Sequence, residues 1–116
     1  MMIGCDIVEI ERIKNAYTKL GDSFSDRVLS EREREIFIQK KRSMSFLSGR
    51  FAAKEAVSKS LKTGLGKLGL KNIEILAGED GEPVVYLNGQ KADMEVSISH
   101  SKNMAMAVAI ENRGNK

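Results

Sequence analysis

Two acidic side chains stand where a charge needs a partner. Asp6 lies in a stretch of alternating side chains, on the same face as Gly4 and Val8, and an isolated buried carboxylate is very costly. Glu55 lies one helical turn before Lys59, a spacing that places both side chains on one helix face. Each carboxylate therefore has two interpretations: a structural ion pair, or a ligand of a hard cation such as Mg²⁺, which prefers oxygen.

Cationic side chains gather around Glu55 in the same predicted helix. Arg50 and Lys54 fall inside its apolar arc, and Lys59 lies beside that arc. Mg²⁺ keeps several waters and completes its shell with substrate phosphates, whose charge nearby lysines neutralise. The sequence therefore allows metal-assisted phosphate chemistry, although lysines that extend along the edge of a core give the same pattern.

Two further features carry weaker signals. His100, the only histidine, ends a predicted strand, where it is either a hydrogen-bonded edge residue or a catalytic group. The glycine-rich stretch 63–69, which contains Gly64, can approach a phosphate by its backbone but lacks the strand, loop and helix order of a nucleotide-binding loop. With one His and one Cys in the chain, a zinc site is excluded.

The elements that would position these residues form an α+β pattern. A strand is predicted over 2–10, helices over 11–20, 31–40 and 43–63, and hairpins over 72–89 and 94–110. Residues 22–29 are predicted as a turn, and the helix 31–40 as solvated, with Ser30 and Glu33 forming its capping box. Small residues on the longest helix allow a close approach to a sheet. We therefore expect a long helix packed on an antiparallel sheet.

The composition is that of a soluble globular protein. The chain has 116 residues, 41% apolar and 30% charged, which favours a single domain over 1–116. No apolar run reaches 18 residues and the start lacks a signal-peptide pattern, so we expect a cytoplasmic protein outside the membrane. Cys5, the only cysteine, lies in an apolar segment and is expected to be buried.

The charge and the last strand bear on partners. The net charge is +3, and the six aromatic residues, two Tyr and four Phe, are not interleaved with basic residues as a nucleic-acid surface requires. Both faces of the strand ending at Ile110 are apolar. That pattern predicts one face against the long helix and the other against a partner subunit.

Three segments together resemble the holo-acyl-carrier-protein synthases, the small type of phosphopantetheinyl transferase. They are I-G-C-D-I-V-E-I-E-R-I at the start, F-L-S-G-R-F-A-A-K-E-A-V-S-K-S-L-K-T-G in the long helix, and V-S-I-S-H-S-K-N-M-A-M-A-V-A near the end. Their order and spacing match that family over essentially the whole chain, and the three in order are a specific signal.

The resemblance implies that the chain transfers 4'-phosphopantetheine from coenzyme A to a serine of an apo acyl carrier protein, releasing adenosine 3',5'-bisphosphate and supporting fatty acid biosynthesis. It implies that Asp6 and Glu55 bind Mg²⁺ with the coenzyme's pyrophosphate, and that Lys59 supports the leaving phosphate. The general base stays open between Asp6, Glu55 acting through a metal-bound water, and water alone. The resemblance further assigns the coenzyme site to a set of four residues: Arg50, Lys54, Gly64 and His100.

The family resemblance also implies a homotrimer with active sites between subunits, and a docking surface for the carrier protein at Arg12, Phe24 and Arg27. Two alternatives are a catalytically inactive relative that only binds coenzyme A or the carrier protein, and a small basic nucleic-acid-binding module. The first predicts ligand binding without transfer. The second predicts nucleic-acid affinity with a steep dependence on salt.

Overall fold

The computed structural model describes residues 2–61 and 69–112. In chain order the elements are β1 (Met2–Glu9), α1 (Ile10–Leu20), α2 (Asp22–Val28), α3 (Glu31–Gln39), α4 (Met44–Leu61), the 3₁₀ turn η2 (Leu70–Asn72), β2 (Ile73–Ala77), β3 (Pro83–Leu87), β4 (Gln90–Lys91), β5 (Met94–His100) and β6 (Met104–Glu111). The predicted α+β class, with a long helix packed on an antiparallel sheet, is confirmed.

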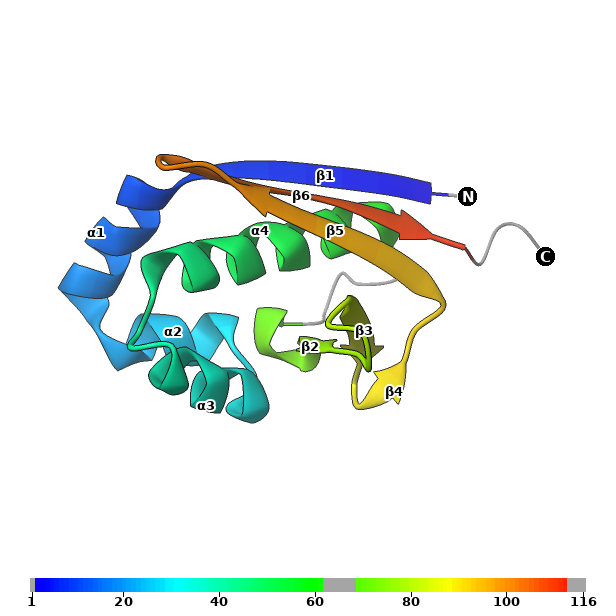
Figure 1. Cartoon of the computed structure of the whole chain (residues 1–116), viewed down its shortest axis with the longest axis horizontal. Helices are drawn as coiled ribbons and strands as arrows, with labels where there is room; N and C mark the ends of the chain where they lie inside the picture. Colours follow the sequence, from blue (N-terminus) through cyan, green and yellow to red (C-terminus); the bar gives the residue numbers. More distant parts are fainter. Residues whose placement is uncertain (1, 62–68, 113–116) are drawn as a thin grey trace.

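The main sheet has the strand order β1-β6-β5, and every neighbouring pair is antiparallel. Helix α4 runs along one face of this sheet and contacts all three strands (Figure 1). Alternation sets which side chains meet the helix: Ala105, Ala107 and Ala109 of the central strand are buried, and Gly4 and Val8 of β1 share that face. The predicted hairpin over 94–110 and its contact with the long helix are both confirmed.

Helix α4 begins at a capped end and carries small side chains where it meets the sheet. The Ser43 hydroxyl accepts a hydrogen bond from the Phe46 N–H at 3.2 Å, which satisfies a free donor of the first turn. Ala52, Ala53 and Ala56 have no exposed surface. Because these side chains are short, the helix axis lies close to the strands, as the sequence predicted.

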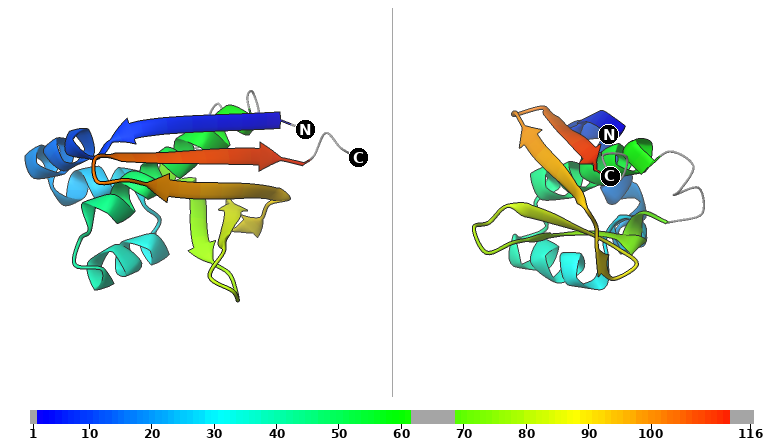
Figure 2. Two further views of the ribbon diagram at one scale, coloured as in Figure 1. Left: turned by 45° about the horizontal axis from the view of Figure 1, so that its top comes forward. Right: turned by 90° about the vertical axis from the view of Figure 1, so that its right-hand side faces the viewer.

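A second layer lies on the other side of α4. It contains α2, α3 and the small sheet β2-β3-β4 (Figure 2 shows it in two further views). The capping box is confirmed, because the Ser30 hydroxyl accepts from the Glu33 N–H and the Glu33 carboxylate accepts from the Ser30 N–H. Residues 22–28, however, form a helix where a turn was predicted. Its seven residues, about two turns, are too few for sequence periodicity to reveal.

Two burial predictions need correction. Helix α3 is not simply solvated, since Glu33 and Phe37 are buried in it. Cys5 is exposed. Alternation along β1 places its side chain on the sheet face opposite that of Gly4, and no described helix covers that face (Figure 1). That face also exposes Ile3, Ile7 and Met106.

In the described part of the chain, no helix combines the length and the apolar character needed to cross a bilayer.

Candidate active site

The site begins with a close contact between β1 and α4 at Gly4. A Cβ placed on Gly4 would lie 2.1 Å from the Ala56 carbonyl oxygen and 2.6 Å from the Ser60 nitrogen. Both neighbours are helix backbone and cannot rotate away, so only glycine fits. This contact sets Asp6, two residues along the same strand face, against the helix side that carries Lys59.

Asp6 and Lys59 form an ion pair at the edge of this contact. The Lys59 Nζ donates to Asp6 Oδ1 at 3.0 Å and to the Cys5 carbonyl oxygen at 3.0 Å. The Asp6 hydrogen bond and charge raise the pKa of Lys59 above its usual value. The lysine side chain is 57% exposed and that of Asp6 is 18% exposed, so solvent reaches the pair and an arriving ligand can exchange one partner.

Asp6 and Glu55 converge on one cleft of about 390 Å³. Glu55 is half-buried on α4, and its side chain points about 100° around the helix from that of its buried neighbour Lys54. The cleft is also lined by residues of β1, α1, α2 and α4, namely Ile7, Val8, Arg12, Ile13, Ala16, Phe24 and Phe51. The two predicted metal carboxylates and two of the three predicted docking residues, Arg12 and Phe24, therefore face one space.

The donor set of this cleft suits a metal that also binds the substrate. Among the described residues, no group of three or more His, Cys, Asp or Glu side chains is placed to hold a metal ion. Two carboxylates in one cleft provide hard oxygen ligands for Mg²⁺, which commonly takes one or two from protein and the rest from phosphates and water. Asp6 and Glu55 fit that requirement, and Lys59 adds a positive charge for the phosphate.

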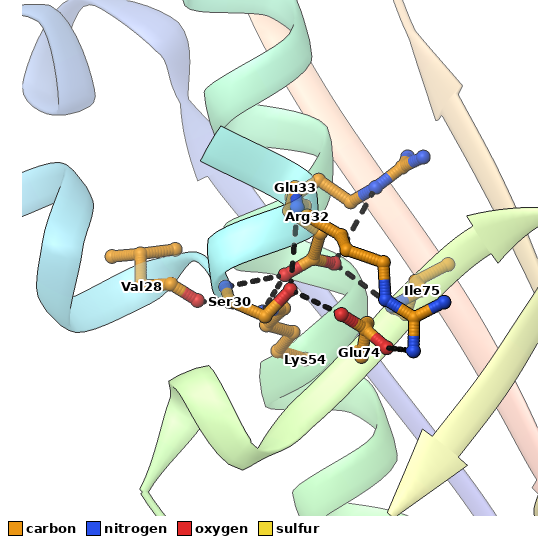
Figure 3. Close-up of polar contacts among 8 residues, drawn as sticks. Val28, Ser30, Arg32, Glu33, Lys54, Glu74 and Ile75 are labelled. Carbon is orange, nitrogen blue, oxygen red and sulfur yellow. Dashed lines mark hydrogen bonds and ion pairs between the residues drawn. The ribbon is translucent and has the colours of Figure 1, made fainter. Parts of the chain in front are cut away.

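A second carboxylate and lysine pair lies in the interior, and sequence reasoning missed its acidic member. Glu33 and Lys54 are both completely buried and form an ion pair. Lys54 Nζ also donates to the Val28 carbonyl at 2.7 Å, and Figure 3 shows these groups turned toward one another between α3 and α4. The expectation that Lys54 lines the coenzyme site is therefore wrong for this chain, because its ammonium group is enclosed by protein. The one sequence signal for this buried pair was the position of Lys54 inside the apolar arc of its helix.

Arg50 and His100 lie outside the Asp6 cleft in this chain. Arg50 lines another cleft, between the small sheet and β5. His100 is exposed at the end of β5 and is aligned through Ala105 of β6 with Val8 of β1. Two strand spacings, about 10 Å, therefore separate His100 from β1. Gly64, also predicted at the coenzyme site, lies outside the described residues.

Arg27, the third predicted docking residue, is exposed on α2 and does not line the Asp6 cleft. Its Nε donates to the Ser23 carbonyl at 3.3 Å within the same helix. The side chain therefore stands on the surface beside Phe24, available to a partner that covers the mouth of the cleft.

Comparison with known proteins agrees with this arrangement. Residues 2–110 match the family model described as the 4'-phosphopantetheinyl transferase superfamily. The chain belongs to that superfamily. A holo-[acyl-carrier-protein] synthase of a Geobacillus species is 46% identical over 114 residues, which cover 96% of this chain and 95% of the relative. The predicted resemblance to these synthases is confirmed.

Solved structures give the same result. The holo-(acyl-carrier-protein) synthase of Bacillus anthracis, in complex with CoA (3',5'-ADP), is 37% identical with a TM-score of 0.78, and the match covers 93% of this chain and 92% of that one. The Helicobacter pylori synthase, in complex with coenzyme A, is 35% identical with a TM-score of 0.81, covering 94% and 98%. The long helix on an antiparallel sheet is therefore the fold of these synthases.

Proposed function

We propose that this chain acts as a single transferase domain that moves the 4'-phosphopantetheine group of coenzyme A onto a serine of an apo acyl carrier protein. The observation that carries the proposal is that Asp6 and Glu55 line one cleft together with Arg12 and Phe24, and that Lys59 pairs with Asp6. Carboxylates, a lysine and a basic rim suit a substrate with a pyrophosphate and an acidic protein partner.

In the reaction, the serine oxygen attacks the β-phosphorus of coenzyme A and the bond to the adenosine 3',5'-bisphosphate oxygen breaks. Mg²⁺, when held by Asp6 and Glu55, would neutralise charge on the pyrophosphate. Lys59, already 3.0 Å from Asp6, places a cation where the leaving phosphate gains negative charge. The serine proton leaves to Asp6, to Glu55 through a bound water, or to water.

The carrier protein is proposed to dock across Arg12, Phe24 and Arg27. Arg12 and Phe24 line the cleft, and Arg27 is exposed one helical turn beyond Phe24. Docking there would bring an acidic partner to the cleft mouth, and its serine toward Asp6 and Glu55. The two arginines complement the partner's charge, while Phe24 supplies an apolar contact.

We further propose that the active form is a homotrimer with each active site between two subunits. The sheet face opposite α4 exposes Ile3, Ile7 and Met106, a set that supports burial against another copy. Arg50 and His100, proposed as coenzyme-site residues, lie outside the Asp6 cleft of their own chain. A neighbouring copy would supply them. The particle mass in solution, measured by light scattering, tests the trimer.

The decisive experiment mixes the purified protein with coenzyme A, Mg²⁺ and an apo carrier protein, and weighs the carrier by mass spectrometry. We expect the carrier to gain one phosphopantetheine. An unchanged mass with several different carrier proteins would overturn the proposal. If coenzyme A binds while no carrier gains mass, the chain is instead a binding relative without transferase activity.

A further inference from the structure

The buried carboxylate of Glu33 is held by donors from three elements. Its Oε1 accepts hydrogen bonds from the Ser30 N–H at 2.9 Å and from Lys54 Nζ. Its Oε2 accepts from the Ile75 N–H of β2 at 2.8 Å. Figure 3 shows these donors surrounding the carboxylate from α3, α4 and β2. Because backbone groups supply two of the three hydrogen bonds, the carboxylate has a fixed position.

The same carboxylate faces a side chain that reaches a ligand-sized space. Arg50 Nε lies 3.8 Å from Glu33 Oε2, and the Arg50 side chain is only 16% exposed. Its guanidinium carbon lies 4.6 Å from the centre of the Phe46 ring, within the range of a cation–π contact. Burial lowers the pKa of Arg50, and the Glu33 charge opposes that shift. Glu33 therefore lies beside the Nε edge of the guanidinium and Phe46 beside one face, while the Nε hydrogen has no hydrogen-bond partner among the described residues.

Arg50 also lines a cleft of about 260 Å³ between the small sheet and β5. The terminal nitrogens of an arginine are the donors that bind phosphate in pairs. Among the described residues that line this cleft, Arg50 alone is charged, and the others are Ala77, Gly81, Pro83, Val96, Ser97 and Ile98. With Glu33, Lys54 and Arg50 all ionised, the three carry one net positive charge, and Arg50 presents it at the cleft.

We propose that Glu33 is a positioning residue that holds the Arg50 guanidinium for an anionic group of coenzyme A. This inference rests on the proposed function, which supplies the ligand. Glu33 itself is enclosed and never touches that ligand. It acts through its charge, which attracts the guanidinium from 3.8 Å, while the Phe46 ring restricts the plane, so that the terminal nitrogens are oriented before the ligand arrives. Preorganisation of this kind reduces the side-chain entropy lost on binding.

The test must separate positioning from folding. Glu33→Gln alone leaves Lys54 buried and unpaired, so the informative variant is the pair Glu33→Gln with Lys54→Met, which removes both buried charges together. Calorimetric Kd values for coenzyme A are measured for the wild-type chain, this paired variant, Arg50→Ala, and the triple variant. Circular dichroism and thermal melting establish that each variant is folded. A second route is Phe46→Leu, which leaves the Glu33–Lys54 pair intact.

We expect Arg50→Ala to raise the Kd for coenzyme A about tenfold or more, because the change removes a charge-assisted contact. The paired variant should raise Kd several-fold when Arg50 is present and leave it unchanged when Arg50 is already alanine. Phe46→Leu should show the same dependence on Arg50. A purely structural role predicts equal effects whether residue 50 is arginine or alanine, and that result would overturn the proposal. The absence of any effect of the paired variant, or of Phe46→Leu, would overturn it as well.

The proposed function has its own readout in the same series. Transfer by the wild-type chain, measured as carrier mass, is scored separately from the Kd values. Transfer together with equal effects in the two Arg50 backgrounds overturns only the positioning role. Arg50-dependent effects on coenzyme A binding without any transfer support positioning and overturn only the proposed function. A wild-type chain that does not bind coenzyme A overturns both.

Discussion

Helix α4 carries two lysines that each pair with a carboxylate from another element, and the two pairs differ in every other respect. Lys59 and Asp6 meet at a cleft, with exposed fractions of 57% and 18%. Lys54 and Glu33 are both fully buried, and Glu33 accepts two backbone hydrogen bonds besides. Solvent reaches the Asp6 carboxylate, which leaves it open to a ligand, whereas the Glu33 carboxylate is enclosed by protein.

Residue type and helix position do not by themselves identify a functional charge. Lys54 and Glu55 are sequence neighbours, yet Lys54 points into the interior while Glu55 lines the cleft, because successive helical residues point about 100° apart. What separates the two pairs is access to solvent and the number of fixed partners. A ligand-binding carboxylate keeps lone pairs free, and a structural one has them occupied.

The largest expected effect concerns the two carboxylates of the Asp6 cleft. Asp6→Ala or Glu55→Ala should lower the rate of phosphopantetheine transfer by about 10³-fold or more, since each removes a charge aimed at the pyrophosphate. Carrier mass over time measures that rate. Glu9→Ala, at the exposed end of β1 and outside the cleft, is the matched control and should retain activity. Wild-type turnover in either cleft variant would contradict the metal assignment.

Breaking the buried pair of Glu33 and Lys54 should lower the free energy of unfolding. Glu33→Gln leaves the Lys54 ammonium buried without its counter-charge, which typically costs about 3–5 kcal/mol of unfolding free energy. Urea denaturation measures the loss. Lys59→Met, the matched change at the exposed pair, should leave the denaturation midpoint nearly unchanged. Similar midpoints for the two variants would show that the pairs differ less than their burial implies.

Part of this contrast could be predicted from the sequence. Alternation placed Asp6 with Gly4 and Val8 on the covered face of a strand, and the structure confirms that face. The capping box of Ser30 and Glu33 was also predicted correctly. These features depend on residues at most four positions apart, where local geometry decides which side chains meet.

The rest depended on contacts between distant segments. Glu33 was predicted on a solvated helix, and its burial follows from Lys54, 21 residues away, and from the Ile75 N–H, 42 residues away. The exposure of Cys5 was missed because an apolar neighbourhood in sequence does not say whether anything covers that face. Helix α2 was missed because seven residues provide too little periodicity.

A third experiment tests the contact that creates the exposed pair. Gly4→Ala places a methyl group 2.1 Å from the Ala56 carbonyl, so β1 and α4 must separate. We expect a loss of about 2–3 kcal/mol in unfolding free energy, at the upper end of overpacking effects, together with reduced transfer because Asp6 moves. Gly89→Ala at the surface turn between β3 and β4, where φ is +83° and no atom lies within 4 Å of an added Cβ, is the control for backbone strain without a clash. Equal transfer rates in these two variants would remove Gly4 from the account of the site.

A smaller effect is expected at the rim of the cleft. Arg12→Glu should raise the KM for the carrier protein about tenfold, because it reverses a charge facing an acidic partner, while the KM for coenzyme A changes little. Steady-state kinetics with each substrate varied in turn measures the two constants. Lys14→Glu makes the same charge change on an exposed position of α1 that does not line the cleft. Equal rises in both KM values, or equal effects of the two variants, would place the docking surface elsewhere.

The smallest effect is the titration of Lys59 itself. The hydrogen bond and charge of Asp6 raise its pKa above 10.5, so the folded chain holds this proton more tightly than the unfolded chain. The pair's contribution to stability is therefore fully present below pH 10.5 and is lost as pH rises through the folded-state pKa. NMR titration of the Lys59 side chain should show the raised value, and Asp6→Asn should bring it back toward 10.5. An unshifted pKa in the wild-type chain would mean that solvent screens the pair almost completely, leaving Asp6 effectively without a partner until a metal binds.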